Sequence, residues 1–330
     1  MKNQAKIVCV GGGTGTFVVL KGLKSFTRNL SAIVSMSDSG GSNKRIRDEF
    51  GLLPTSDLRQ CYIALSDENG GSGVLRRLFM YRFTKGQGIS GMTFGNLFMA
   101  ALADILGSQE RAIRETGKIL RIHGAVIPVT FTKTNLHAVY ADGTAAAEEH
   151  LIDEPDHDGK LKITGMFLKP AAKANPEALS AIAAADLVVL GPGDLFTSVI
   201  PNLLVKGIPE ALQKTGAKKV YVMNLMTKYG QTYDFTALDH LQTLETYLGQ
   251  TLDAIIVNTK DLPPPALKLY AKYHELPVID NLSRNSYYQV VRAKVASGKT
   301  VRRVAGDKLI RSLIRHDSTE LAKVLVKLIV

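Results

Sequence analysis

The stretch from Ala5 to Asn43 alternates apolar runs with glycine-rich turns, and this pattern restricts the fold more than any other part of the chain. A first apolar run, Ile7-Val8-Cys9-Val10, leads into the turn Gly11-Gly12-Gly13-Thr14-Gly15, and apolar side chains then recur at helical spacing. A second apolar run ends in the turn Ser37-Asp38-Ser39-Gly40-Gly41-Ser42. We therefore predict strand, turn, helix, strand and turn, which is how an α/β fold with a parallel sheet begins.

Both glycine turns are suited to holding phosphate, because glycine lets backbone N–H groups approach a ligand and a helix N-terminus adds partial positive charge. Their spacing matches neither the G-x-G-x-x-G dinucleotide fingerprint nor a P-loop, which would need a lysine, so tight turns without a ligand stay open as the alternative. Asp38 suggests a ribose contact in a nicotinamide enzyme. Because it lies inside the second glycine turn, it is better placed near phosphates or a metal.

Composition narrows the class of protein. The 330 residues suffice for one large α/β domain or two smaller ones, and no apolar run reaches membrane-spanning length. The first residues lead straight into a predicted strand, so we expect no signal peptide. Cys9 and Cys61 lack metal-ligand spacing, which favours a reducing, cytoplasmic location. The net charge of +11 fits an anionic ligand, whereas nucleic acid is disfavoured because Trp is absent and no aromatic and basic reader motif occurs.

The second half of the chain returns to strand, turn and helix. Asn175-Pro176-Glu177 has the cap, proline and acid typical of a helix start. The turn Gly191-Pro192-Gly193-Asp194 is followed by Thr197 and Ser198, whose hydroxyls would suit a phosphate. In a parallel sheet such polar turns share the carboxyl edge, where ligands bind. The elements predicted here are strands at 187–190, 219–223, 253–258 and 277–279 and a final helix at 318–329.

Residues 44–122 are predicted to be mainly helical. Arg45 on the first of these helices would either reach a phosphate or lie on a surface. Asn96, at the start of a later helix, would offer its amide to a ligand or only cap the helix.

Short strands alternate with turns from about 126 to 168, among them the hairpin turn Asp142-Gly143. The histidines here lack a ligand pattern. We therefore predict one Rossmann-like α/β domain over residues 1–330, a mostly parallel sheet with helices on both faces and a small antiparallel, β-rich insertion at about 126–168. The strands expected in the insertion are 129–131, 136–140, 144–152 and 163–167.

Seven turn motifs occur along the chain: Gly11-Gly12-Gly13-Thr14-Gly15, Asp38-Ser39-Gly40-Gly41-Ser42, Asp57-Leu58-Arg59, Gly95-Asn96-Leu97, Gly191-Pro192-Gly193, Asn224-Leu225-Met226-Thr227 and Arg315-His316-Asp317. They follow the order seen in the CofD/YvcK family, which this chain resembles over nearly its whole length. That family includes 2-phospho-L-lactate transferase and the bacterial gluconeogenesis factor. The resemblance implies a Rossmann-like fold that binds a nucleotide diphosphate at the carboxyl edge of the sheet.

In the transferase branch, a hydroxyl of the deazaflavin Fo attacks the phospholactyl phosphorus of a nucleotide-activated phospholactate and the nucleoside monophosphate leaves, with help from a divalent metal. By this resemblance Asp38 would be the catalytic acceptor-site carboxylate or a metal ligand. The chain departs from the family where Met92 replaces a frequent His, Ser39 a second acid and Asp194 a Ser.

Tyr270-Ala271 followed by Pro277-Val278, together with the C-terminal Arg315-His316-Asp317, resembles the gluconeogenesis-factor branch. There the implied ligand is a UDP-sugar, and the protein acts in regulating carbon metabolism and cell shape rather than in catalysis. By this resemblance Tyr270 would stack on or bond the nucleotide, and Arg315 would meet the diphosphate. A packed tyrosine and a surface ion pair with Asp317 are the alternatives.

We therefore expect a UDP-sugar-binding regulatory protein, with a phospholactate-type transferase as the second hypothesis and a nicotinamide-dependent oxidoreductase as the third. The expected partner is a nucleotide-diphosphate ligand, without membrane or nucleic acid; Mg²⁺ is expected only for an enzyme, and the base, the sugar and homo-oligomer formation stay open. The candidate ligand contacts are Gly11, Gly12, Gly13, Thr14, Gly15, Ser37, Gly40, Gly41, Ser42, Arg45, Asn96, Gly191, Gly193, Asp194, Thr197, Ser198, Asn224, Met226, Thr227, Tyr270 and Arg315.

Overall fold

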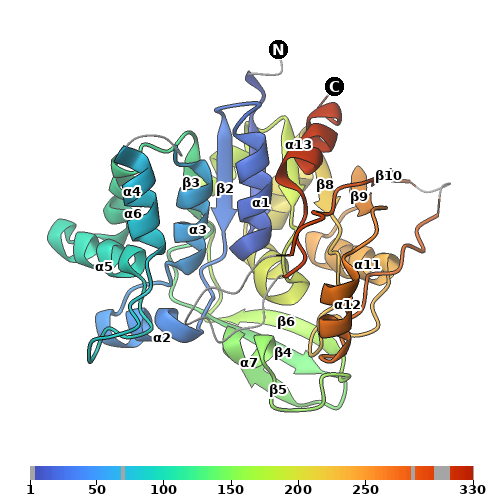
Figure 1. The fold of residues 1–330 in the computed structure, drawn as a ribbon, viewed down its shortest axis with the longest axis horizontal. Coiled ribbons are helices and arrows are strands. Elements are labelled where there is room, and N and C mark those ends of the chain that lie inside the picture. Colours follow the sequence, from blue (N-terminus) through green and yellow to red (C-terminus); the bar gives the residue numbers. More distant parts are fainter. Residues whose placement is uncertain (1–3, 68–70, 284–286, 301–312, 330) are drawn as a thin grey trace.

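The computed structural model describes residues 4–67, 71–283, 287–300 and 313–329 (Figure 1). Its main sheet has seven strands: β1 (Ile7–Gly11), β2 (Leu30–Val34), β3 (Ala125–Pro128), β7 (Leu187–Leu190), β8 (Lys218–Val222), β9 (Ala254–Asn258) and β10 (Gln289–Ala293). They lie in the order β10-β9-β8-β7-β1-β2-β3, and every neighbouring pair is parallel. The predicted α/β class with a mostly parallel sheet is confirmed.

The order of the strands reverses beside β1. The chain runs from β1 outward to β2 and β3, then returns to place β7, β8, β9 and β10 on the other side. Val10 at the end of β1 pairs with Leu190 at the end of β7, so the turns after these two strands leave the sheet side by side. In an open parallel sheet, the crevice at such a reversal is where ligands bind.

Helices cover both faces of the sheet. They are α1 (Gly13–Leu23), α2 (Gly41–Phe50), α3 (Ser56–Leu65), α4 (Gly71–Met80), α5 (Phe94–Leu106), α6 (Gln109–Ile119), α7 (Glu149–Asp153), α8 (Pro176–Ala183), the π-helical turn η2 (Leu195–Val199), α9 (Ile200–Leu203), α10 (Ile208–Lys214), α11 (Ala237–Leu248), α12 (Pro264–Ala271) and α13 (Ser318–Lys327). On one face α1 packs between α3 and α13 (Figure 1). On the other face α9 packs on β1, and α8 and α10 pack on each other.

Burial on both faces explains why the strands are continuous apolar runs in the sequence. Cys9, Ile33 and Val189 are fully buried in the core. Burial raises the pKa of Cys9 to about 12, so its thiol stays protonated and packs as an apolar group. Helix α1 approaches α13 closely at Gly22, where a Cβ would lie 1.9 Å from the carbonyl oxygen of Ser318.

A small sheet of three antiparallel strands lies below the carboxyl edge of the main sheet in Figure 1. Its strands are β4 (Asn135–Tyr140), β5 (Ala145–Ala147) and β6 (Ile163–Lys169). The predicted start of the insertion near 126 is wrong, because residues 125–128 form β3, which pairs with β2 in the main sheet. An apolar run of this length specifies a strand but not the sheet that it joins.

Three other expected strands also differ from the structure. No strand forms at 129–131, and the strand expected at 144–152 ends at Ala147, after which α7 begins. The strand expected at 277–279 is a single bridge between Pro277 and Met226. The sequence analysis missed β10, whose residues are only half-buried at the edge of the sheet.

In the part of the chain that the structure describes, no helix has both the length and the apolar character needed to cross a bilayer.

Candidate functional site

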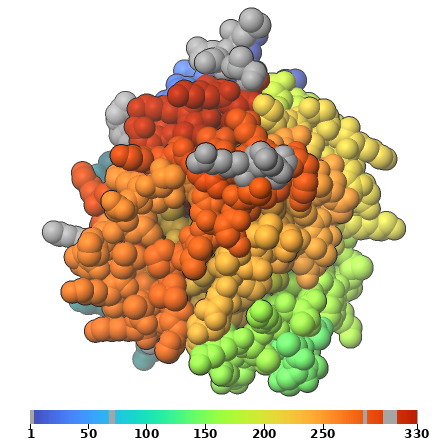
Figure 2. Space-filling model, turned by 90° about the vertical axis from the view of Figure 1, so that its right-hand side faces the viewer, coloured from blue at the N-terminus to red at the C-terminus, as the bar shows by residue number. Residues whose placement is uncertain are grey.

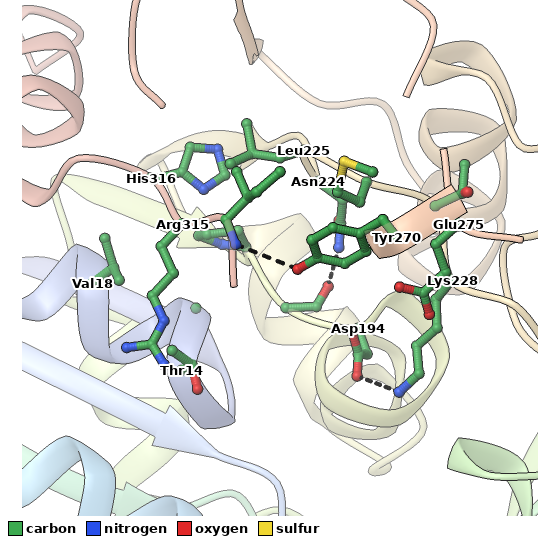
Figure 3. A pocket seen from close by; sticks show the side chains of 16 residues that line it. Thr14, Val18, Asp194, Asn224, Leu225, Lys228, Tyr270, Glu275, Arg315 and His316 are labelled. Carbon is green, nitrogen blue, oxygen red and sulfur yellow. Dashed lines mark hydrogen bonds and ion pairs between the residues drawn. The ribbon is translucent and has the colours of Figure 1, made fainter. Parts of the chain in front are cut away.

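A cleft of about 150 Å³ opens where the strand order reverses (Figure 3). It lies between the turns after β1, β7 and β8 and segments from the C-terminal third of the chain, whose outer surface is seen in Figure 2. Its lining residues are Thr14, Gly15, Val18, Pro192, Gly193, Asp194, Asn224, Leu225, Met226, Thr227, Lys228, Tyr270, Glu275, Ile314, Arg315 and His316.

The first wall of the cleft is the N-terminus of α1. Gly12 at its N-cap has no side chain to accept hydrogen bonds from the first turn, and that turn contains no acidic residue. The partial positive charge of this helix end is therefore not offset within α1. Gly15 fits only as glycine, because a Cβ would lie 1.7 Å from the carbonyl oxygen of Pro192. This contact brings α1 directly against the turn after β7.

The second wall comes from the turns after β7 and β8. Asn224 donates from Nδ2 to the carbonyl oxygen of Gly193 at 2.7 Å and accepts from the Tyr221 hydroxyl at 2.9 Å. These bonds hold the two turns together beside the cleft.

The third wall consists of α12 and the segment before α13. The Tyr270 hydroxyl oxygen accepts hydrogen bonds from the backbone N–H of Leu313 at 2.9 Å and of Ile314 at 3.4 Å. Arg315, the next residue, extends its guanidinium toward Thr14 at the start of α1 (Figure 3). Burial lowers the pKa of Arg315, but a guanidinium stays charged in proteins, so the cleft contains a permanent cation.

A charged network forms the end of the cleft near β8. Lys228 forms ion pairs with Asp194, at 2.9 Å, and with Asp153 of α7. Asp153 also accepts from Gln231 Nε2 at 3.1 Å and from the Thr197 hydroxyl at 3.4 Å. Burial alone would lower the pKa of Lys228, but the two carboxylates outweigh it and raise this pKa, so the ammonium is charged.

Glu275 lies next to this network. Burial raises its pKa to about 7; Lys228 opposes the rise and Asp194 adds to it. The negative charge of the cleft therefore changes near neutral pH.

A second group of polar residues, which we name the Asp38 cluster, lies at the ends of α2, α3 and α5. It consists of Asp38, Ser42, Asn43, Ser56, Arg59 and Asn96. Asn43 donates to Asp38 Oδ2 at 2.5 Å, and its own oxygen accepts from the Ser56 hydroxyl at 3.0 Å. Asn96 donates to the hydroxyls of Ser42 and Ser56, each at 3.1 Å.

Arg59 completes the Asp38 cluster from α3. Its Nε donates to Asn96 Oδ1 at 3.3 Å, and only 4% of the residue is exposed. Burial, and then the charge of Arg82, lower its pKa to about 10, so it stays charged at neutral pH. Asp57, beside Arg59, reaches toward the first glycine turn, since a Cβ on Gly12 would lie 2.2 Å from Asp57 Oδ2.

Asp38 was the candidate metal ligand. Its Oδ1 accepts from the backbone N–H of Gly40 at 2.9 Å and its Oδ2 from Asn43. No group of three or more His, Cys, Asp or Glu side chains suited to a metal occurs within the described ranges. Mg²⁺ is often held by one or two carboxylates plus substrate phosphates, so a metal at Asp38 would depend on oxygens of a ligand.

The structure separates the predicted contacts. Asn96 and the second glycine turn belong to the Asp38 cluster or its immediate surroundings, while the lining of the cleft does not include Gly11, Gly12, Gly13, Gly191 and Ser198. The predicted contacts that line the cleft are Thr14, Gly15, Gly193, Asp194, Asn224, Met226, Thr227, Tyr270 and Arg315.

Arg45 and Thr197 lie outside the lining of the cleft. Arg45 pairs with Glu49 at 3.1 Å and donates to the carbonyl oxygens of Gly88 and Ser90, away from the cleft. Thr197 is 6% exposed, and its hydroxyl is bonded to Asp153 and Gln231. The contacts of Thr197, and those of Arg45 with Gly88 and Ser90, join residues distant along the chain, so the sequence could not indicate them.

Sequence reasoning missed Lys228, Glu275 and Asp153. Lys228 directly follows the motif Asn224-Leu225-Met226-Thr227, so its position next to a predicted turn was an available signal. The sequence contains no comparable signal for Asp153 and Glu275, because α7 and the residues after α12 come close to Lys228 only in the folded chain.

The fold and the cleft define a class of protein: an open, parallel α/β domain with a cleft at the strand-order reversal, lined by a helix N-terminus and an arginine. Residues 7–296 match the sequence profile of the family described as 2-phospho-L-lactate transferase CofD. The chain therefore belongs to the CofD family, as the turn motifs predicted.

Relatives within this family have a different name. The chain is 40% identical over 334 residues to a putative gluconeogenesis factor of Aquifex aeolicus, covering 99% of this chain and 97% of that protein. It is 36% identical to the gluconeogenesis factor of Bacillus subtilis, covering 100% and 99%. A crystal structure of a Bacillus halodurans protein superposes with a TM-score of 0.86 at 34% identity, covering 98% of this chain and 99% of that one. The chain is thus similar to gluconeogenesis factors over its whole length.

Proposed function

We propose that this protein binds a nucleoside diphosphate derivative of the UDP-sugar class in the cleft and regulates carbon metabolism and cell shape by doing so. The observation that carries the proposal is the convergence of the N-terminus of α1, with Thr14 and Gly15 in the lining, and the Arg315 guanidinium on one cleft. A helix N-terminus offers N–H groups to an anion, and arginine binds phosphate oxygens bidentately.

The remaining lining suits the other parts of such a ligand. The Tyr270 ring lines the cleft and supports a base or sugar ring, while Asp194 and Glu275 can accept hydrogen bonds from ribose or sugar hydroxyls. The names of the relatives support a regulatory role, since several are called gluconeogenesis factors.

Isothermal titration calorimetry with UDP-N-acetylglucosamine and UDP-glucose tests this proposal, with NAD(H) and NADP(H) as comparison ligands. We expect saturable binding of at least one UDP-sugar and none of the nicotinamide nucleotides. Absence of heat with every UDP-sugar, at concentrations up to the millimolar range, would exclude the proposal. Mass spectrometry of a ligand released from the purified protein would identify the base and sugar.

A transferase of the 2-phospho-L-lactate type is the second candidate. The observations in its favour are the family profile and the carboxylate of Asp38 after β2. The test is turnover of Fo with nucleotide-activated phospholactate and Mg²⁺, in the wild type and in Asp38→Asn. Turnover by the wild type that is lost in Asp38→Asn would favour the transferase function. A wild type without turnover would favour the nucleotide-binding function instead.

A further inference from the structure

A second cavity, of about 240 Å³, lies where the C-terminal end of α2 meets the small sheet. Figure 1 shows these two elements next to each other at the lower edge of the molecule. None of its lining residues lines the first cleft. They are Met36, Arg47, Asp48, Gly51, Leu52, Leu53, Pro54, Lys133, Thr134, Asn135, Lys169 and Pro170.

Positive charge dominates this cavity. Arg47, Lys133 and Lys169 line it against a single carboxylate, Asp48. Within the described residues, neither lysine forms an ion pair or a side-chain hydrogen bond, and Arg47 donates only to the neutral amide oxygen of Asn135 at 3.0 Å. Among the described lining residues, three cations therefore stand against one carboxylate, an excess of two positive charges.

Two of the three cations come from regular structure, Arg47 from α2 and Lys169 from the end of β6, whereas Lys133 lies in the loop before β4. The hydrogen bond from Arg47 to Asn135 joins α2 to the start of β4. Asn135 pairs directly with Lys169 across β4 and β6. Gly51 ends α2 with a φ of +64°, and a Cβ there would lie 3.7 Å from Nζ of Lys133, so this lysine also lies beside the helix end.

We propose that this cavity is a second ligand site, which takes a small phosphorylated metabolite. A phosphate monoester carries a charge of about −1.5 to −2 at neutral pH, close to the excess of two cations in the lining. Lysine and arginine are the usual partners of phosphate oxygens. The apolar Met36, Leu53 and Pro54 would contact a short carbon skeleton.

This proposal does not depend on nucleotide binding in the first cleft. The second cavity and the Asp38 cluster are nevertheless connected through α2. This helix contributes Arg47 to the cavity near one end, and Ser42 and Asn43 to the Asp38 cluster at the other.

The test is calorimetry of the full chain with 3-phosphoglycerate, with glycerate as the probe without phosphate. We expect 3-phosphoglycerate to bind, glycerate to bind at least about tenfold more weakly, and the affinity to fall as salt is raised. The double variant Lys133→Gln/Lys169→Gln should weaken binding by about tenfold or more, because it removes two charge-assisted contacts. The matched control is Lys214→Gln/Lys272→Gln, two exposed lysines outside both cavities, which should bind like the wild type.

Equal affinity in the two double variants, or no binding of 3-phosphoglycerate by the wild type, would overturn the proposal. The single variant Arg47→Lys keeps the charge and gives an independent measure if the double variant unfolds. Titration of the same proteins with UDP-N-acetylglucosamine separates this result from that of the first cleft, since Lys133→Gln/Lys169→Gln should leave UDP-sugar binding unchanged.

Discussion

The first cleft and the Asp38 cluster lie at the same carboxyl edge of the sheet, but their polar groups are used differently. In the Asp38 cluster, Asn43 and Asn96 bond to hydroxyls and a carboxylate of the same cluster. In the cleft, the N-terminus of α1 and Arg315 both line an open volume. The comparison suggests that one glycine turn builds a scaffold and the other a binding site.

The two regions should therefore respond differently to substitution. Changes in the Asp38 cluster should lower the free energy of unfolding, whereas changes in the cleft should lower ligand affinity. The contact between the turns after β1 and β7 should affect both.

Gly15→Ala should have the largest effect. Its Cβ would lie 1.7 Å from the carbonyl oxygen of Pro192, so the two turns must separate. We expect the free energy of unfolding to fall by about 1–3 kcal/mol and UDP-sugar binding to be lost. Urea denaturation and calorimetry measure the two quantities. The control is Gly216→Ala, where a Cβ meets nothing within 4 Å; wild-type behaviour of Gly15→Ala would refute the proposed contact.

Arg315→Gln should affect affinity alone. Loss of a charge-assisted contact costs about 1.5–3 kcal/mol, which corresponds to roughly 10- to 100-fold weaker UDP-sugar binding. Thermal unfolding should change little. Arg28→Gln removes an exposed arginine before β2, at the opposite edge of the sheet, and should bind normally. If both variants bind equally well, Arg315 does not contact the ligand.

Asn43→Ala should lower stability and leave ligand affinity nearly unchanged, which is the opposite of Arg315→Gln. The side chain is 1% exposed and accepts from the backbone N–H groups of Thr55 and Ser56 as well as bonding Asp38. Leaving these groups unpaired should lower the free energy of unfolding by about 1–3 kcal/mol. UDP-sugar affinity, measured where the variant is folded, should stay within about threefold of the wild type. Asn29→Ala, which removes an exposed amide, is the control; a large loss of affinity with normal stability would reverse our assignment of the two regions.

The smallest effect should be a pH dependence from Glu275, whose pKa is raised to about 7 by burial. Below that pH the carboxyl is neutral, and above it a negative charge enters the cleft. The diphosphate of a UDP-sugar does not titrate in this range, so binding should be tighter at pH 6 than at pH 8.

Glu275 should also make the free energy of unfolding depend on pH. The folded protein holds the carboxyl proton more tightly than the unfolded chain does, so the stability that this proton contributes is lost as pH rises from about 4.5 to 7.

Glu275→Gln should remove the pH dependence of UDP-sugar affinity and that of the free energy of unfolding. Calorimetry and urea denaturation at several pH values measure the two quantities. An unchanged pH profile in the variant would mean that another group titrates.

Much of the fold could be predicted because its signals are local. Strands buried on both faces must be apolar along their length, as at 187–190, and Asn175 before Pro176 has the cap chemistry of α8, where its side chain accepts from the backbone N–H of Glu177. The beginning of the small sheet was predicted wrongly because strand character at 125–128 says nothing about which sheet the strand joins.

The candidate site was predictable only in part. Glycine turns indicate places where another part of the backbone approaches closely, and Thr14, Gly193 and Asn224 do line one cleft. The sequence did not distinguish the first glycine turn from the one at Asp38, since both are glycine-rich turns that follow an apolar run and precede a helix.

The local pattern alone specified a parallel α/β sheet with polar turns at its carboxyl edge, because the burial of a strand and the geometry of a glycine turn depend on neighbouring residues. The tertiary structure alone established which turns share a cleft, which carboxylates surround Lys228 and where Arg47, Lys133 and Lys169 come together. Those features arise from the strand order and from side chains far apart along the chain, and their electrostatic consequences exist only after burial removes water.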